Sequence, residues 1–350
     1  MQQEDNRTVE DLFSNIDTSP NVVDIADDDD EDALEVDSAE WEMDSAVGGM
    51  SFVSSTQSLS SSLYEHVVEN GRTYHKFKEG KYPLPNDEPE QDRLDFQHQV
   101  YKLSLEGKLY QAPVENPRNV LDVATGTGIW AIEFAQENPG SNVVGTDLSP
   151  IQPTYVPPNC SFQICDAEDE WDFSVPFDFI HMRAVVTCFR SPRAVMESAM
   201  SSLAPGGWLQ MRDPIMPFKF LTPPPEGCAL ARWNDLAMEA SGRIGRRWDN
   251  AVHYAQWMRE LGFADVVEIK EQLPLNPWAK GRRVKYLSLW LQHDMLQGIE
   301  AISMALFTRV LGWDVDDLKV FLEDVKRDMK DTSIHSYSEG VLVYGRKPLG

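Results

Sequence analysis

Hydrophobic residues change their spacing along the middle of the chain in a way that predicts alternating strands and helices. A short apolar run at 120–123 leads into a turn of small residues, and the apolar residues from Ile129 to Phe134 then follow helical spacing. This order predicts a strand, a tight loop and a helix. Strand-like runs recur at 142–147 and 161–166. The pattern is typical of the opening units of an α/β sheet that binds a nucleotide-like ligand.

The later pattern predicts how the sheet is completed. A fourth strand is expected at 177–182, followed by a helix that begins at Ser191 and Pro192 and is stopped by the glycines at 206 and 207. We expect further elements in this order: a strand at 208–211, a proline-rich stretch at 214–225, helices at 229–244 and 252–261, a strand at 265–269, helical sequence at 284–329 and a last strand at 340–345.

A helix is also predicted before the first strand of the sheet. Asp87 is a capping acid, Pro89 is an early helical proline, and Glu90 follows Asp87 by three residues, which is a helix start signal. Phe96 and Val100 begin an apolar stripe at helical spacing. The sequence therefore predicts a helix of about five turns that leads to the strand at 120–123.

The loop after the first strand carries the strongest chemical signal of the sequence. Gly126 and Gly128 allow a ligand to lie against the backbone and the loop to take positive φ, and they precede the amides of a helix start. The spacing matches a dinucleotide fingerprint, with Asp147 at the expected distance, so a nicotinamide cofactor is one interpretation. Asp122 favours another, because a carboxylate there repels a pyrophosphate but suits the ammonium and sulfonium of S-adenosylmethionine.

Three acids end three successive strands. Asp122, Asp147 and Asp166 are therefore expected at the carboxyl edge of the sheet, where open α/β sheets bind ligands. There Asp147 would accept hydrogen bonds from the ribose hydroxyls of the cofactor, and Asp166 would accept one from the adenine amino group. The alternative is that such acids cap the following helices. Three acids in register, together with the glycines, favour the ligand.

Taken together, the residues from about 71 to the C-terminus resemble class I S-adenosylmethionine-dependent methyltransferases, and more narrowly the fungal LaeA-like methyltransferases. The narrower match rests on the segments 71–75, 78–85, 87–95, 146–153, 177–181, 205–208, 273–278 and 346–348. Ala124 replaces a glycine that is common at its position, a change expected to be tolerated because it adds only one methyl group. Residues 211–213 stand where such enzymes often have a glutamate-rich strand end, so no catalytic role is assigned to them.

The resemblance implies a fold: a seven-stranded, mostly parallel Rossmann-like sheet with helices on both faces, an N-terminal helical lid and a helical insertion before the last strand. The lid would span 63–117 and the methyltransferase domain 118–350. The last two strands would form an antiparallel hairpin. The helical segment at about 276–335 between them is far longer than a hairpin needs, so it is expected to cover the substrate site.

The resemblance also implies a set of site residues. The expected cofactor contacts are Asp122, Ala124, Gly126, Gly128, Asp147, Leu148, Asp166 and Ala167, with Tyr74, His75 and Tyr82 from the lid. The alternative for the three lid residues is that they anchor the N-terminal segment by packing. His181 is a candidate catalytic base because its pKa is near the working range, and the competing interpretation is a structural histidine.

Charge is concentrated at the N-terminus. The 350 residues carry a net charge of -26, and residues 1–60 hold 17 acids with Arg7 as their only base. This low hydrophobicity and high charge predict a disordered tail over 1–62, which would either dock a basic partner or only solvate the chain. The acidic excess argues against direct binding to nucleic acid, because phosphate contact needs clustered lysine and arginine.

Several classes of protein are not supported. No secretion signal and no run of 18 apolar residues is present, so the expected location is the cytoplasm, the nucleus or both, without a membrane span. Cys160, Cys165, Cys188 and Cys228 have neither the spacing of a zinc site nor that of a disulfide framework, and no metal is expected.

Three functions remain after this reading. The leading one is S-adenosylmethionine-dependent methyl transfer to a small natural product or to a protein, linked to fungal secondary metabolism by the resemblance. The second, also implied by the resemblance, is a subunit of a nuclear regulatory complex with velvet-type proteins and little turnover of small molecules. The third is an NAD-dependent oxidoreductase. The sequence does not identify the methyl acceptor, because one fold hosts many reactions.

Overall fold

The computed structural model describes residues 65–349, so the predicted tail at 1–62 lies outside the described residues. The described part begins with an antiparallel hairpin of β1 (His66–Glu69) and β2 (Arg72–His75), which the sequence reading did not predict. The helix α3 (Glu88–Ser104) follows as expected. The Asp87 side chain accepts from the backbone nitrogen of Glu90, which confirms the predicted cap. The lid is therefore a hairpin, a loop and one helix.

The central sheet of the described chain has seven strands in the order β5-β4-β3-β6-β7-β9-β8. Its bounds are β3 (Asn119–Val123), β4 (Asn142–Asp147), β5 (Cys160–Ile164), β6 (Phe177–Arg183), β7 (Leu203–Phe220), β8 (Ala264–Pro274) and β9 (Ser336–Arg346). The first five of these strands run parallel, and β9 is antiparallel to both β7 and β8. The predicted fold class and its closing antiparallel hairpin are confirmed.

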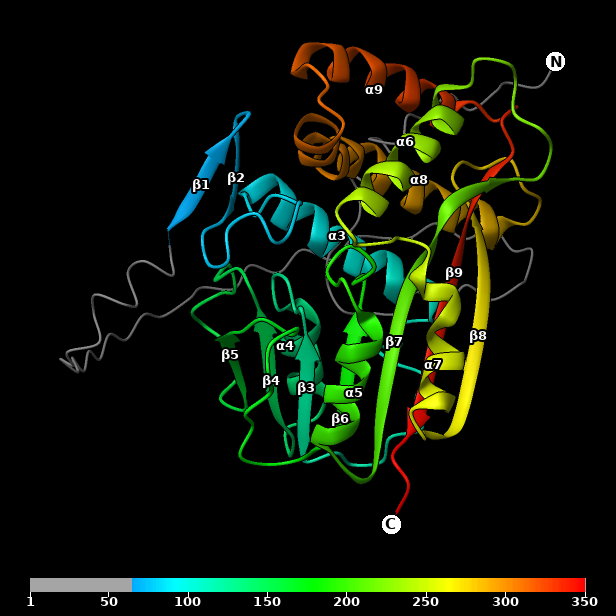
Figure 1. The fold of residues 1–350 in the computed structure, drawn as a ribbon. Coiled ribbons are helices and arrows are strands. Elements are labelled where there is room, and N and C mark those ends of the chain that lie inside the picture. Colours follow the sequence, from blue (N-terminus) through cyan, green and yellow to red (C-terminus); the bar gives the residue numbers. More distant parts are fainter. Residues whose placement is uncertain (1–64, 350) are drawn as a thin grey trace, which may run out of the picture. The chain divides into compact units, whose positions relative to one another are not determined.

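Helices cover both faces of this sheet (Figure 1). The helices α5 (Pro192–Ser202) and α7 (Tyr254–Glu260) pack on one face through Val195, Met196 and Met258, which join a core cluster with Leu121 and other strand residues. The helix α4 (Ile129–Glu137) packs on the other face. There Trp130 and Phe134 are buried with Val120 and Phe179, among other residues. The apolar residues of β3 are buried on both sides, as a parallel sheet requires.

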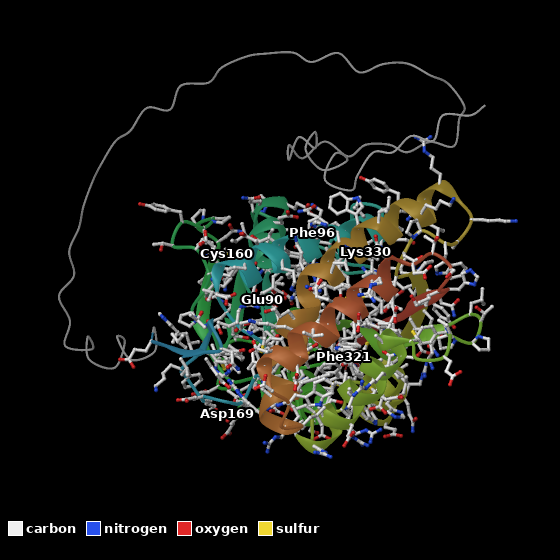
Figure 2. The ribbon with its side chains drawn as sticks, turned by 90° about the horizontal axis from the view of Figure 1, so that it is seen from above. Glu90, Phe96, Cys160, Asp169, Phe321 and Lys330 are labelled. Carbon is white, nitrogen blue, oxygen red and sulfur yellow. The ribbon has the colours of Figure 1, made fainter. Side chains whose placement is uncertain are left out.

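A helical layer covers the end of the sheet toward which the parallel strands point (Figure 1). It consists of α6 (Ala229–Arg243), α8 (Arg282–Ala305), the π-helical turn η2 (Leu306–Val310) and α9 (Val315–Lys330). A core cluster of its own, which includes Trp233, Phe307 and Leu322, holds these helices together. In the view from above, α8 and α9 cross the molecule, with Phe96 of α3 and Phe321 of α9 on either side of α8 (Figure 2). The predicted helical insertion is therefore present between β8 and β9.

Several boundaries differ from the sequence prediction: β7, β8 and β9 are longer than expected, and the helical sequence at 284–329 is divided into α8, η2 and α9. The strand β7 continues through the prolines at 214 and 217 to Phe220, whereas a proline-rich loop was expected from residue 214. Pro217 lies where the pairing with β9 shifts register, between Ile215 and Lys219, which is where a strand can accept a proline, whereas Pro214 is paired with Gly340. The helix expected at 252–261 is a 3-10 turn, η1 (Asn250–His253), followed by α7. None of the helices in residues 65–349 is long and apolar enough to cross a membrane.

Candidate functional site

The two glycines of the loop after β3 have different tasks. Both take positive φ, +60° at Gly126 and +83° at Gly128. A Cβ at Gly128 would lie 2.3 Å from the Phe162 ring, so this glycine is needed for packing against β5. A Cβ at Gly126 would meet only Leu94 of α3, at 3.6 Å. Gly126 therefore keeps the backbone open toward a ligand, and Gly128 keeps the loop in place.

Ala124 shows why a glycine is common at its position. Its φ is +55°, in the left-handed region that costs an L-residue roughly 1–2 kcal/mol. The sequence argument considered only the added methyl group, whereas the backbone conformation is the larger cost. Ala184, just beyond β6, has a similar φ of +56°. Two strained alanines thus lie at neighbouring strand ends, as is common where a site is built.

Asp147 lies at the end of β4 and is tied to the glycine loop. Its carboxylate accepts hydrogen bonds from the backbone nitrogens of Gly126, at 2.8 Å, and Ser149, at 2.9 Å. Burial raises the pKa of Asp147 to about 6, although these two hydrogen bonds oppose the shift. Each oxygen has a second lone pair that remains for a ligand hydroxyl.

Asp122 is occupied inside the protein. Its Oδ1 lies 2.7 Å from Nδ1 of His181, and the Thr125 hydroxyl donates to its Oδ2. The His181 ring stacks on Trp130 with centroids 3.7 Å apart and planes 6° from parallel. Both residues are buried, and burial lowers the pKa of His181. These contacts support the structural interpretation of His181, because its ring is held within the sheet and not at the cavities described below.

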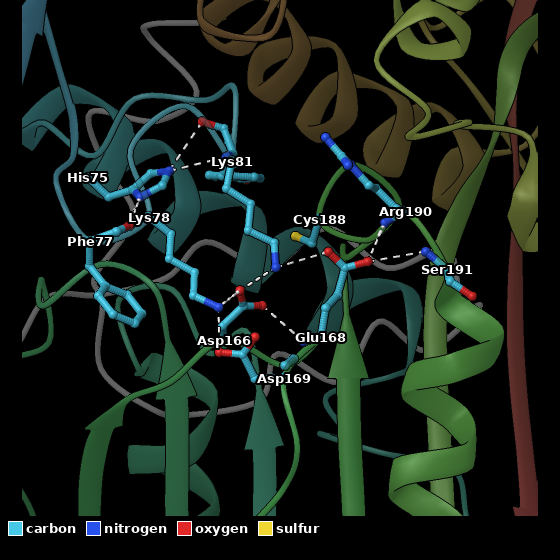
Figure 3. Close-up of polar contacts among 12 residues, drawn as sticks. His75, Phe77, Lys78, Lys81, Asp166, Glu168, Asp169, Cys188, Arg190 and Ser191 are labelled. Carbon is cyan, nitrogen blue, oxygen red and sulfur yellow. Dashed lines mark hydrogen bonds and ion pairs between the residues drawn. The ribbon is translucent and has the colours of Figure 1, made fainter.

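Asp166 is held by two lysines of the lid (Figure 3). Lys78 Nζ lies 2.7 Å from Asp166 Oδ2, and Lys81 contacts the same oxygen. Lys81 also lies 3.1 Å from Oε2 of Glu168. Asp166 Oδ1 accepts from the backbone nitrogen of Glu168 at 2.9 Å. An adenine amino group would therefore share this carboxylate with two ammonium groups, a feature that the sequence did not indicate.

Of the three predicted contact residues of the lid, two support the lid loop and one lines the cavities. Nδ1 of His75 lies 2.6 Å from the carbonyl of Phe77, and the backbone nitrogen of Tyr82 donates to Nε2 of His75 (Figure 3). His75 is 1% exposed and Tyr74 is 3% exposed, so both act as buried anchors of the loop, as the packing alternative predicted. Tyr82 differs from them because it lines both cavities described next.

A first cavity, of about 1000 Å³ including space open to solvent, lies over the ends of β3, β4 and β5. It brings together seven of the predicted site residues: Tyr82, Ala124, Gly126, Asp147, Leu148, Asp166 and Ala167. Five predicted residues do not line it: Tyr74, His75, Asp122, Gly128 and His181. Lining residues that the sequence analysis did not predict include Lys81, Leu94, Gln97 and Thr127, and Arg183 also lines this cavity.

A second cavity, of about 1120 Å³ measured in the same way, adjoins the first. The two share Tyr82, Leu94, Gln97 and Ala184 in their walls. The rest of the second cavity is mainly aromatic and aliphatic, with side chains that include Val186, Met216, Phe218, Trp233, Trp248, Leu291, Met295 and Ile302. Its polar wall contains Arg93, Arg212, Asp213, Glu271 and Asp294, among others. The shared residues show that the two cavities lie next to each other.

Asp213, in the middle of β7, is a buried acid to which the sequence analysis assigned no role. Its carboxylate accepts from the Tyr254 hydroxyl at 2.8 Å and from the backbone nitrogen of Val186 at 3.0 Å. Burial raises the pKa of Asp213 to about 7. An acid directly after the strand predicted at 208–211 could have drawn attention to this position, but the raised pKa depends on burial, which only the folded structure provides.

The first cavity fits S-adenosylmethionine. The open backbone at Gly126 leaves room for the ligand, and Asp147 presents acceptors for the ribose hydroxyls. When bound, this cofactor supplies a methyl group that is already activated by its sulfonium. The protein then has to orient the two reactants and exclude water, which together supply much of the rate. Within residues 65–349 no group of three or more acidic, histidine or cysteine side chains could hold a metal ion.

Comparison with known proteins agrees with this fit. The model of a methyltransferase domain matches residues 96–268. The chain is 35% identical over 300 residues to the methyltransferase pytC of Aspergillus terreus, covering 84% of this chain and 92% of that protein. It is 38% identical over 264 residues to "Probable methyltransferase tdiE" of Emericella nidulans, covering 74% of this chain and 82% of that protein.

A third relative has a different description. The secondary metabolism regulator laeA of Aspergillus fumigatus is 34% identical over 306 residues, covering 86% of this chain and 82% of that protein. These matches extend well beyond the glycine loop, so they replace its dinucleotide interpretation. The chain therefore belongs to the fungal LaeA-like family of class I S-adenosylmethionine-dependent methyltransferases.

Proposed function

We propose that the second cavity binds the methyl acceptor and that this acceptor is a small, mainly apolar molecule. The observation that carries the proposal is the shared wall: Tyr82, Leu94, Gln97 and Ala184 line both cavities. A molecule in the second cavity can therefore present one atom to the first cavity while its body remains among apolar side chains. Burial of such a body would supply binding energy, since each buried CH₂ contributes about 0.8 kcal/mol.

The walls of the second cavity favour a small molecule over a protein segment. The helix α8 supplies Leu291, Met295 and Ile302, and α6 supplies Trp233. These helices belong to the layer that covers the strand ends, so the acceptor would lie beneath helices and not on an open surface (Figure 1). Concave, largely apolar cavities with a few polar groups are typical of small-molecule sites.

Asp213 suits an acceptor that loses a proton on methylation. It lies in the wall of the second cavity, and burial raises its pKa to about 7. A carboxyl with such a pKa can take a proton near neutral pH, which matches a hydroxyl acceptor better than a neutral amine. The acceptor oxygen would then form its bond to the methyl carbon while the bond from that carbon to the cofactor sulfur breaks and its electron pair stays on sulfur. The acceptor proton would pass to the carboxylate of Asp213.

A variant that fills the second cavity tests the proposal. Leu291→Trp places an indole in the cavity wall, and Val320→Trp, on the exposed face of α9 (69% exposed), is the matched control. The purified full chain is given radiolabelled S-adenosylmethionine and an extract of small molecules. We expect label in the small-molecule fraction with the wild type and the control, and its loss with Leu291→Trp at unchanged cofactor affinity. Transfer to proteins alone would contradict the proposal.

A regulatory role is the second candidate, favoured by the description of one relative as a secondary metabolism regulator. In this role the chain would act in the nucleus with velvet-type proteins and turn over little small molecule, whereas the leading proposal is compatible with the cytoplasm. Pull-down of velvet-type proteins by the full chain and by a chain without residues 1–60 tests it. Capture that depends on residues 1–60, with no label transfer, would support the regulatory role, and absence of capture would count against it.

A further inference from the structure

The positively charged side chains that line the two cavities differ in whether an acidic side chain pairs with them. Within the described chain these are Lys81 and Arg183 in the first cavity and Arg93 and Arg212 in the second. Lys81 pairs with Asp166 and Glu168, Arg93 with Glu90 and Asp294, and Arg212 with Glu271. Among these four residues of the described chain, only Arg183 forms no ion pair. A half-buried cation without a counterion is costly unless a ligand supplies the charge.

The protein partners of Arg183 do not neutralise it. Its Nη2 lies 2.9 Å from Nδ1 of His98. Burial lowers the pKa of His98 to about 4, so at neutral pH this histidine is uncharged and Nδ1 accepts the hydrogen bond. The guanidinium also lies 4.8 Å from the ring centre of Tyr101, and the guanidinium of Arg212 lies at the same distance from that ring. Arg212 supplies no counter-charge to Arg183, because it is itself a cation and is paired with Glu271.

Burial also disfavours the charged form of Arg183 itself. It lowers the pKa of the guanidinium to about 10, although the more distant charges of Asp122 and Glu133 oppose the shift. Arg183 remains charged at neutral pH, and an anion close to it would restore the usual pKa. The group is therefore prepared for an anionic ligand.

The place of Arg183 along the sheet edge indicates which anion. Its strand, β6, follows β3 in the order β5-β4-β3-β6, and the last paired residues are Val123 and Met182. Arg183 thus comes one residue after this pair, as Ala124 does on β3. Asp147 and Asp166, expected to hold the adenosine, end β4 and follow β5 on the other side of the loop. The opposite end of the cofactor, its amino acid, would lie toward β6.

We propose that Arg183 binds the α-carboxylate of S-adenosylmethionine, with His98 and Tyr101 as the residues that position its guanidinium. Arg183 lines the first cavity and not the second, so a carboxylate of the cofactor fits its position better than one of the acceptor. A guanidinium matches a carboxylate with two parallel hydrogen bonds, donated by Nη2 together with Nη1 or Nε. Nη2 of Arg183 donates one of its two hydrogens to His98, which leaves the other for the carboxylate, and within residues 65–349 no acceptor is found for Nη1 or Nε. The inference concerns the cofactor and does not depend on the identity of the acceptor.

Calorimetric titration of the full chain with two ligands tests the proposal. The ligands are S-adenosylmethionine and decarboxylated S-adenosylmethionine, which differ only in the carboxylate. We expect Arg183→Gln to weaken binding of S-adenosylmethionine by about 10- to 100-fold, the loss of a hydrogen bond to a charged group, and to change binding of the decarboxylated ligand by less than about twofold. Arg183→Lys keeps the charge and should recover part of the difference.

The control is Arg212→Gln, which removes the other guanidinium beside Tyr101 but has Glu271 as its partner. Its ratio of the two affinities should equal that of the wild type. Melting temperatures of all variants establish that they are folded. If Arg183→Gln weakens both ligands equally, Arg183 only supports the fold. If it weakens neither, the carboxylate lies elsewhere, on the acceptor or at another residue. Either result would overturn the proposal.

Discussion

The carboxylate of Asp147 accepts a hydrogen bond from the backbone nitrogen of Gly126 over 2.8 Å, and this bond joins the end of β4 to the loop after β3. The two features that the sequence suggested separately, an acid at a strand end and a glycine loop, are thus one unit. The other carboxylate oxygen of Asp147 accepts a hydrogen bond from the backbone nitrogen of Ser149. A substitution of Asp147 is therefore expected to remove contacts to a bound ribose and to loosen the loop that lies against the ligand.

Asp147→Ala is expected to weaken binding of S-adenosylmethionine by about 1.5–3 kcal/mol, the range for hydrogen bonds to a charged group, while the protein stays folded. The reason is the loss of the acceptors for the ribose hydroxyls, together with the support of Gly126. Calorimetric titration measures the affinity, and circular dichroism verifies the fold. Unchanged affinity in a folded variant would remove Asp147 from the cofactor site.

The same residue should make cofactor binding depend on pH. Burial raises the pKa of Asp147 to about 6, and ribose hydroxyls donate to its ionised form, so affinity should rise with pH through this value. For a carboxylate that must be ionised, the expected change is about tenfold between pH 5 and pH 7. Asp147→Asn cannot ionise and should bind weakly with little pH dependence. A parallel pH profile in both proteins would assign the titration to another group.

Substitutions of the two loop glycines should have different effects, one on cofactor binding and the other on stability. In Gly126→Val the side chain enters the first cavity at a residue with φ of +60°, so cofactor binding should be lost while the sheet persists. In Gly128→Ala the methyl group would collide with Phe162, and overpacking with left-handed strain should cost about 2–5 kcal/mol of stability. Urea unfolding and calorimetry separate the two effects. The double variant Gly128→Ala with Phe162→Leu should regain part of the stability, and no regain would show that the Phe162 contact is not the cause.

Lys81 should keep the lid loop closed over the cofactor. It contacts Asp166 and Glu168 and is 21% exposed, so Lys81→Ala should favour opening of residues 76–86 by about 1 kcal/mol. Hydrogen exchange of these amides should become about fivefold faster. The control is Lys76→Ala, whose pair with Glu79 is exposed on both sides and should contribute little. Equal exchange in the two variants would mean that Lys81 does not restrain the loop.

Asp213 should make the protein lose stability as pH rises. Burial raises its pKa from 3.8 to about 7 in the folded state, so between these values the folded protein binds the proton that the unfolded chain releases. The free energy of unfolding therefore falls as pH increases across this interval. Asp213→Asn cannot ionise and therefore lacks this contribution to the pH dependence. Between pH 5 and pH 7 the free energy of unfolding should fall less in the variant than in the wild type, and the difference between the two should be about 1–3 kcal/mol.

Urea denaturation at several pH values measures this difference. Asp147 also has a raised pKa, but it is present in both proteins and cancels in the comparison. Identical pH dependence in wild type and variant would show that Asp213 ionises with an ordinary pKa. It would then be a poor candidate for the proton acceptor in the second cavity.

The sequence determined the order and type of the central elements because each depends on local signals. Apolar runs, the Asp87 cap and the glycine loop depend on residues close together in the chain, and they placed α3, β3 and α4 correctly. The acids at strand ends likewise placed Asp147 and Asp166 at one edge of the sheet, because parallel strands bring their carboxyl ends together. The hairpin β1–β2 was missed although Asn70 and Gly71 are a typical two-residue hairpin turn, because the turn was not considered together with its two four-residue strands.

The tertiary structure decided which of these side chains reach the ligand. Asp122 and Asp147 both lie at strand ends. The Asp122 carboxylate is bound by His181 and Thr125, whereas Asp147 lines the first cavity. Lys81 and Asp166 are 85 residues apart, and Arg183 and His98 are also 85 apart. No local pattern specifies such pairs. Their charges and pKa values depend on burial and on distances between distant segments, and these quantities exist only once the chain has folded.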